Sequence, residues 1–87
     1  MANRAKLLAK ASNSPNNVRY EELCRLAEYF GWTFKRQNRT SHRIYVNLAL
    51  SSEQGRRMNF QDFKGKAKAN QVRQLLAAIE NLPTKDE

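Results

Sequence analysis

Two stretches of this 87-residue chain carry apolar residues at the i, i+3, i+4, i+7 spacing of an amphipathic helix. The apolar positions are Leu23, Leu26, Ala27 and Phe30 in the first stretch and Val72, Leu75, Leu76 and Ile79 in the second. We expect Asn16 or Asn17 to cap the first helix and Gly31 to end it, and we expect Asn70 to cap the second.

Between the two helices the hydrophobic period changes to two residues, which is the spacing of β-strands. Trp32 with Phe34 predicts a first strand, residues 41–48 a second, and Met58 with Phe60 a third. In the second strand, one face holds the predicted core residues and the other is predicted to be open. The core set is Ile44, Val46 and Leu48, and the open set is Arg43, Tyr45 and Asn47. Short connections favour antiparallel pairing of consecutive strands. The predicted class is α+β in the order α-β-β-β-α, a three-stranded antiparallel sheet with two helices on one face.

The length of the chain allows one domain, which we predict at residues 18–82. Residues 1–17 are predicted to be a basic N-terminal extension and linker, and residues 83–87 a C-terminal tail. The lone Cys24 excludes an intramolecular disulfide, and no apolar run is long enough to span a membrane, so a cytoplasmic location is expected. The alternative is a mitochondrial or plastid nucleic-acid-binding protein, because no acidic residue precedes Glu21.

Positive charge is concentrated in the middle of the chain. The whole sequence has 16 Lys and Arg against 8 Asp and Glu, a net charge of +8. Residues 35–73 hold ten basic and two acidic side chains, so this segment alone carries +8. Such a concentration of cations favours a polyanionic partner, of which nucleic acid is the commonest. The alternative is a basic surface that serves only solubility.

Five short blocks match a known pattern in the same order along the chain. They are residues 17–23 (NVRYEEL), 41–45 (SHRIY), 58–62 (MNFQD), 65–68 (GKAK) and 71–76 (QVRQLL). Together they resemble the HicA-type toxin family. The resemblance implies a fold like that of double-stranded-RNA-binding domains, cleavage of mRNA without a metal or other cofactor, and a cognate HicB-like antitoxin. It also implies that His42 is catalytic, because Ser41-His42 matches the family's Gly-Ser-His; Thr40 stands where the family has glycine, and Ala69-Asn70 where it has Pro-Tyr.

His42 is the only histidine, and histidine changes charge near neutral pH without help. Cleavage of RNA by its own 2′-hydroxyl needs a general base for that proton and an acid for the leaving 5′-oxygen. A neutral imidazole among Arg36, Arg39 and Arg43 suits the first task, and Lys35, Tyr45 or water suits the second. The alternative is a structural histidine, because alternation puts His42 in phase with the predicted core residues of its strand.

The predicted RNA-binding residues are the polar and aromatic side chains of the second strand and the cations around it. They are Lys35, Arg36, Arg39, Ser41, Arg43, Tyr45, Lys64, Lys66 and Lys68. Tyr45 is expected to stack on a base from the open face of the sheet, and the three lysines around Gly65 to bind phosphate or form a solvated loop. Other aromatic residues, Tyr20, Tyr29, Trp32 and Phe63, are expected in the core or at its rim. The predicted function is a toxin that acts as a ribonuclease; the alternative is a non-catalytic RNA-binding module of the same fold.

Overall fold

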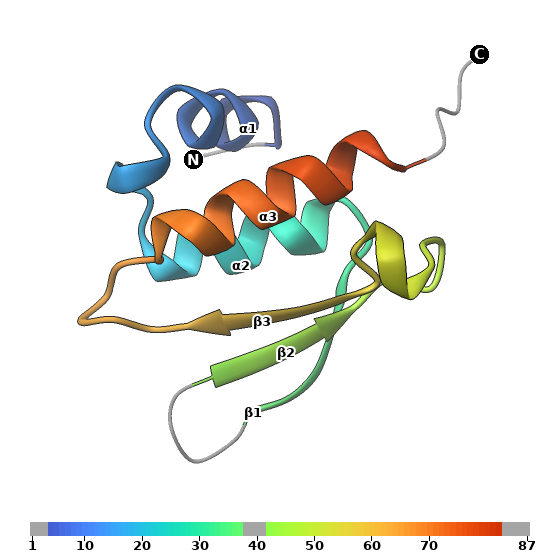
Figure 1. Ribbon diagram of the computed structural model, residues 1–87. Helices are drawn as coiled ribbons and strands as arrows, with labels where there is room; N and C mark the ends of the chain where they lie inside the picture. Colours follow the sequence, from blue (N-terminus) through green and yellow to red (C-terminus); the bar gives the residue numbers. More distant parts are fainter. Residues whose placement is uncertain (1–3, 38–41, 83–87) are drawn as a thin grey trace.

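A computed structural model describes residues 4–37 and 42–82 of the chain (Figure 1). Its α-helices are α1 (Arg4–Asn13), α2 (Tyr20–Tyr29) and α3 (Ala69–Glu80). Its strands are β1 (Thr33–Gln37), β2 (His42–Val46) and β3 (Arg57–Gln61), and its short 3-10 turns are η1 (Pro15–Asn17) and η2 (Ser52–Gln54). The α+β class and the order α-β-β-β-α after α1 are confirmed.

The three strands form an antiparallel sheet in the order β1-β2-β3, with β2 in the middle. Figure 1 shows the helices on one side of this sheet, with α2 and α3 lying on it and α1 farther out against both. One face of the sheet is therefore covered by helices, and the other carries no helix of the described chain. Within β1 the register shifts between Phe34 and Arg36, so Lys35 occupies a β-bulge.

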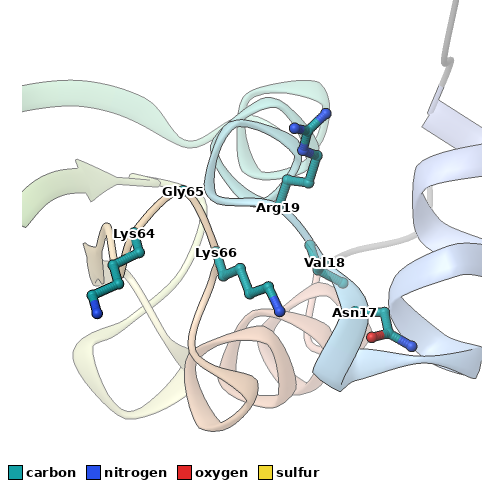
Figure 2. Close-up of a pocket in the computed structure, with 6 residues that line it drawn as sticks. All are labelled: Asn17, Val18, Arg19, Lys64, Gly65 and Lys66. Atoms are coloured by element: carbon teal, nitrogen blue, oxygen red, sulfur yellow. The ribbon is translucent and has the colours of Figure 1, made fainter.

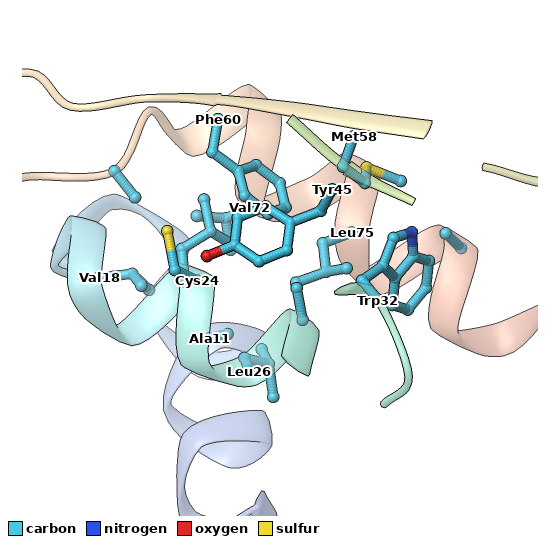
Figure 3. Packing of buried hydrophobic residues seen from close by; sticks show 14 of the residues in the cluster. Ala11, Val18, Cys24, Leu26, Trp32, Tyr45, Met58, Phe60, Val72 and Leu75 are labelled. Carbon is cyan, nitrogen blue, oxygen red and sulfur yellow. The ribbon is translucent and has the colours of Figure 1, made fainter. Parts of the chain in front are cut away.

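The core lies between the helices and the covered face of the sheet (Figure 3). From α2 and α3 it takes Leu23, Val72 and Leu75, none of which is exposed to solvent. The sheet side contributes Tyr45 and Phe60, each 1% exposed. The predicted helical stripes are thus the buried faces of the helices, since removing apolar surface from water is the main driving force for folding.

The faces predicted for β2 are reversed in the structure. Tyr45, expected on the open face, packs in the core, whereas Ile44 is buried outside the core cluster on the helix-free face. Asn47 is also on the core side, where its amide donates to the Phe30 carbonyl at 3.1 Å and accepts the Ala49 N–H at 3.0 Å. Polar atoms can be buried on this face because they are hydrogen-bonded there. Alternation alone could not select the face, because β2 carries large apolar groups on both sides.

Residues 4–13, predicted to be part of an extension, form helix α1 and join the core. Leu7 and Ala11 are buried in the same cluster as the residues of α2 and α3. The Lys10 ammonium forms an ion pair of 2.8 Å with Glu22 on α2, and the guanidinium of Arg4 lies 5.2 Å from the centre of the Phe30 ring. Helix α1 is therefore attached to the domain by apolar packing and by charge. The predicted C-terminal tail lies outside the described residues.

The helix caps differ from those predicted. Arg19 occupies the N-cap position of α2 in place of Asn16 or Asn17, and Lys68 that of α3 in place of Asn70. The Glu22 carboxylate accepts the backbone N–H of Arg19 at 3.0 Å, which satisfies one of the free donors at the start of α2. Gly31 follows α2 with a positive φ of 103°, as its predicted role requires.

Candidate functional site

One end of the sheet gathers most of the residues that the sequence singles out. Because the strands are antiparallel, β2 begins at His42 where β1 ends at Gln37 and β3 ends at Gln61. The turn that follows β3 leads into α3 at the same end (Figure 1). We call this region, with the turn at residues 62–68 and the start of α2, the basic end of the sheet.

His42 is half-buried on the helix-free face of the sheet. It stands opposite Gln61 on β3, and two residues along β2 from Ile44. On each outer strand, the residue paired with Ile44 is a diagonal neighbour of His42: Arg36 on β1 and Asn59 on β3. Diagonal partners on one face lie roughly 7–8 Å apart at Cα, within reach of a long side chain. His42 is thus in phase with the buried Ile44, as alternation predicts, but on the face opposite the core cluster.

The turn after β3 is short and firmly held. Phe63 and Lys66 exchange two backbone hydrogen bonds of 3.0 Å, and the residues between them, Lys64 and Gly65, have positive φ angles of 54° and 85°. Two successive positive φ angles are the mark of a type I′ turn. The Asp62 carboxylate adds a further bond by accepting the Gly65 N–H at 2.7 Å. Lys64 is thus held in a left-handed conformation that residues with a Cβ rarely adopt.

Two further hydrogen bonds attach this turn to the start of α2. The Tyr20 N–H donates to the Gly65 carbonyl, and the Ala67 N–H donates to the Val18 carbonyl, both at 2.9 Å. Between the two segments lies a shallow pocket of about 210 Å³. Its lining residues, drawn in Figure 2, are Asn17, Val18, Arg19, Lys64, Gly65 and Lys66.

The three cations of this pocket do not converge on one point. Figure 2 shows the side chains of Arg19, Lys64 and Lys66 extending in different directions from the backbone. Such an arrangement spreads positive charge over a surface and does not enclose a single anion. Lys68 extends the same surface, since it is exposed at the start of α3.

Two residues predicted to bind RNA lie elsewhere than expected. Tyr45 is buried under α2, so it cannot stack on a base, and this prediction is wrong. Arg43 is half-buried on the same face, with its guanidinium 5.4 Å from the centre of the Tyr20 ring.

Burial raises the pKa of the Tyr20 and Tyr45 phenols and of the Cys24 thiol, so all three remain protonated at neutral pH. Cys24 is a buried thiol, as expected.

The other predicted residues divide into exposed and undescribed ones. Lys35 and Arg36 are exposed on β1, and Arg36 is on the same face as His42. Arg39, Thr40 and Ser41 lie outside the described residues. Two residues of this region were not among the predicted site residues. Arg19 lines the pocket, and Phe63 is 55% exposed although the sequence predicted it in the core or at its rim. In the sequence Phe63 directly precedes Lys64, whereas Arg19 meets this turn only in the folded chain, where it pairs with Lys66.

The part of the chain that the structure describes offers neither a metal cluster nor a membrane-spanning helix, and the sequence and fold have no match among known proteins. Within residues 4–37 and 42–82, no group of three or more His, Cys, Asp or Glu side chains could hold a metal ion. Across the same part of the chain, no helix is long and apolar enough to cross a membrane. Comparisons with protein families, with curated proteins and with solved structures found no match to this chain.

Proposed function

We propose that this chain is a HicA-type toxin, a ribonuclease that cleaves mRNA with His42 as its general acid/base. The proposal is supported above all by one observation: His42 and Arg36 are diagonal neighbours on the helix-free face of the sheet. An imidazole and a guanidinium at this spacing suit a phosphodiester, because one can move a proton while the other holds negative charge. The five sequence blocks that resemble the family support it independently.

In the proposed reaction, His42 accepts the proton of an RNA 2′-hydroxyl. The 2′-oxygen then forms a bond to the adjacent phosphorus while the bond from phosphorus to the 5′-oxygen breaks. The products are a 2′,3′-cyclic phosphate and a 5′-hydroxyl, so no external water enters the first step. Arg36 stabilises the additional negative charge on phosphorus.

The departing 5′-oxygen needs a proton donor. Tyr45 does not suit this role, because it is 1% exposed and lies on the other face of the sheet. Lys35 remains, since it is exposed in the bulge of β1 next to Arg36. A water molecule and the protonated His42 are the other donors that suit this position.

The same proposal includes a HicB-like antitoxin that silences the enzyme by covering His42. Such a partner would present acidic side chains to the basic end of the sheet, and a complex of typical size would bury about 1,600 Å². As the only histidine, His42 reports on this directly. Diethylpyrocarbonate should modify His42 in the free protein and spare it in the complex, and equal modification in both would contradict occlusion.

The experiment that tests the proposed reaction uses RNA and its modified forms. The purified protein should cleave RNA in excess EDTA and leave 2′,3′-cyclic phosphate ends. An RNA of the same sequence with 2′-O-methyl groups should bind but remain intact, because it has no 2′-hydroxyl to attack. Binding of RNA without any cleavage would instead favour the non-catalytic RNA-binding module.

A further inference from the structure

The tip of the turn after β3 carries an exposed aromatic ring among cations. Phe63 is 55% exposed, and the ammonium of Lys64 lies 5.9 Å from the centre of its ring. Lys66 and Arg19 line the adjoining pocket. Asp62, the acidic residue in this turn, has its carboxylate engaged by the Gly65 N–H. The ring is therefore surrounded mainly by positive charge.

We propose that Phe63 is a stacking platform for an unpaired base of single-stranded RNA, with Lys64 and Lys66 holding the neighbouring phosphates. Stacking on aromatic side chains is how proteins bind splayed-out bases, and it operates beside positively charged grooves that follow the backbone. The inference rests on the proposed function in that it takes RNA as the polyanion. It adds that the RNA is single-stranded, because the bases of a duplex are not free to stack on a protein ring.

The backbone of the turn holds Phe63 in position before any ligand binds. Two hydrogen bonds of 3.0 Å fix Phe63 against Lys66, and the bond between Tyr20 and Gly65 ties the turn to α2. A ring presented by a rigid turn loses little conformational entropy on binding, which favours affinity.

Single exposed apolar residues are common, so exposure alone does not identify a base-binding ring. Phe34 provides the comparison, because it is 52% exposed on β1 and is the same type of residue. Its ring packs edge-on against Tyr45 at 5.8 Å, on the helix side of the sheet. Phe63 differs in having a lysine beside its ring and a basic pocket next to it.

The test measures affinity for 2′-O-methyl RNA, which cannot be cleaved, as a single strand and as a duplex of equal length. Phe63→Ala should weaken binding of the single strand roughly 5- to 150-fold, the range for loss of one stacked base. Duplex binding should change less than about twofold, since it depends on phosphates. Phe63→Tyr should retain the affinity of the native chain for the single strand, and the control Phe34→Ala should leave both affinities unchanged.

A fluorescent base separates stacking from charge. The emission of 2-aminopurine in the single strand should be quenched on binding to the native chain and to Phe63→Tyr, and not on binding to Phe63→Ala. The inference is overturned if Phe63→Ala binds the single strand as well as the native chain does, or if it weakens single strand and duplex equally. Neither outcome bears on cleavage, so loss of the Phe63 effect and failure of the proposed catalysis by His42 are distinguishable.

Discussion

The hydroxyl of Tyr45 donates a hydrogen bond of 3.1 Å to the Glu28 carboxylate, which joins the middle strand to helix α2. The ring of Tyr45 lies between Phe34 and Phe60, with ring centres 5.8 Å and 5.6 Å away. These contacts fix which face of β2 meets the helices. Side chains alternate between the two faces along a strand, and His42 is three residues from Tyr45. The same contacts therefore place His42 on the helix-free face.

Tyr45→Phe should destabilise the fold without weakening RNA binding. The change removes one partly buried hydrogen bond and keeps the ring, so the free energy of unfolding should fall by about 0.5–1.5 kcal/mol. Denaturant unfolding measures this change, and titration with uncleavable RNA measures affinity. A large loss of affinity at unchanged stability would show instead that the Tyr45 hydroxyl reaches RNA.

Charge reversal at the turn should weaken RNA binding and reduce its dependence on salt. The double variant Lys64→Glu/Lys66→Glu changes two exposed cations of the basic end of the sheet. For single strands, each lost phosphate contact should reduce the log–log salt slope by about 0.7. The control is Lys6→Glu/Arg25→Glu, with equal charge change at exposed positions of α1 and α2. Equal effects of the two double variants would mean that net charge alone drives binding.

Lowering the pH should weaken the attachment of α1 to the domain, because protonation of Glu22 removes its ion pair with Lys10. Partial burial opposes ionisation of this carboxyl, but hydrogen bonds from Lys10 and from the Arg19 N–H outweigh it and hold the pKa of Glu22 below its ordinary value. A lowered pKa contributes stability at pH values above the unfolded pKa of about 4.3, and this contribution is lost as pH falls through the folded pKa.

Glu22→Gln tests this pH dependence. At pH 7 the free energy of unfolding of the variant should be about 0.2–1 kcal/mol lower than that of the native chain, which is the usual range for an ion pair near the surface. The difference should shrink as the pH is lowered below 4.3 and the native carboxyl takes up its proton. A difference that stays constant over this pH range would show that charge on Glu22 does not stabilise the fold.

Periodicity was enough to predict α2, α3 and the three strands, because the spacing of apolar residues changes from helical to alternating and back along the chain. It could not select the buried face of β2, where Ile44 and Tyr45 are both large and apolar in character. Nor did it reveal that α1 is part of the core, because Leu7 and Ala11 are its two buried residues in an otherwise basic segment. At these positions tertiary packing, and not the local spacing of apolar residues, determines which side chains are buried.

The candidate site was predictable in its chemistry and less so in its geometry. A lone histidine among cations pointed to His42, and antiparallel pairing brings it to the same end of the sheet as the lysines near Gly65. The exposure of Phe63 was not predictable, because an aromatic residue is more often buried than not. The turn that exposes it places Lys64 at positive φ, where glycine or asparagine is the usual sequence signal.

The role of His42 is tested most directly by His42→Ala, assayed for RNA cleavage, RNA affinity and thermal unfolding on the same preparation. The matched control is Gln61→Ala, which removes the side chain opposite His42 but no group that exchanges protons near neutral pH. Loss of a general base should slow cleavage by about 10²–10⁴-fold. RNA affinity and the melting temperature should stay near those of the native chain, because His42 is outside the core and the cations remain. Cleavage by His42→Ala at the rate of the native chain would contradict the proposed catalytic role.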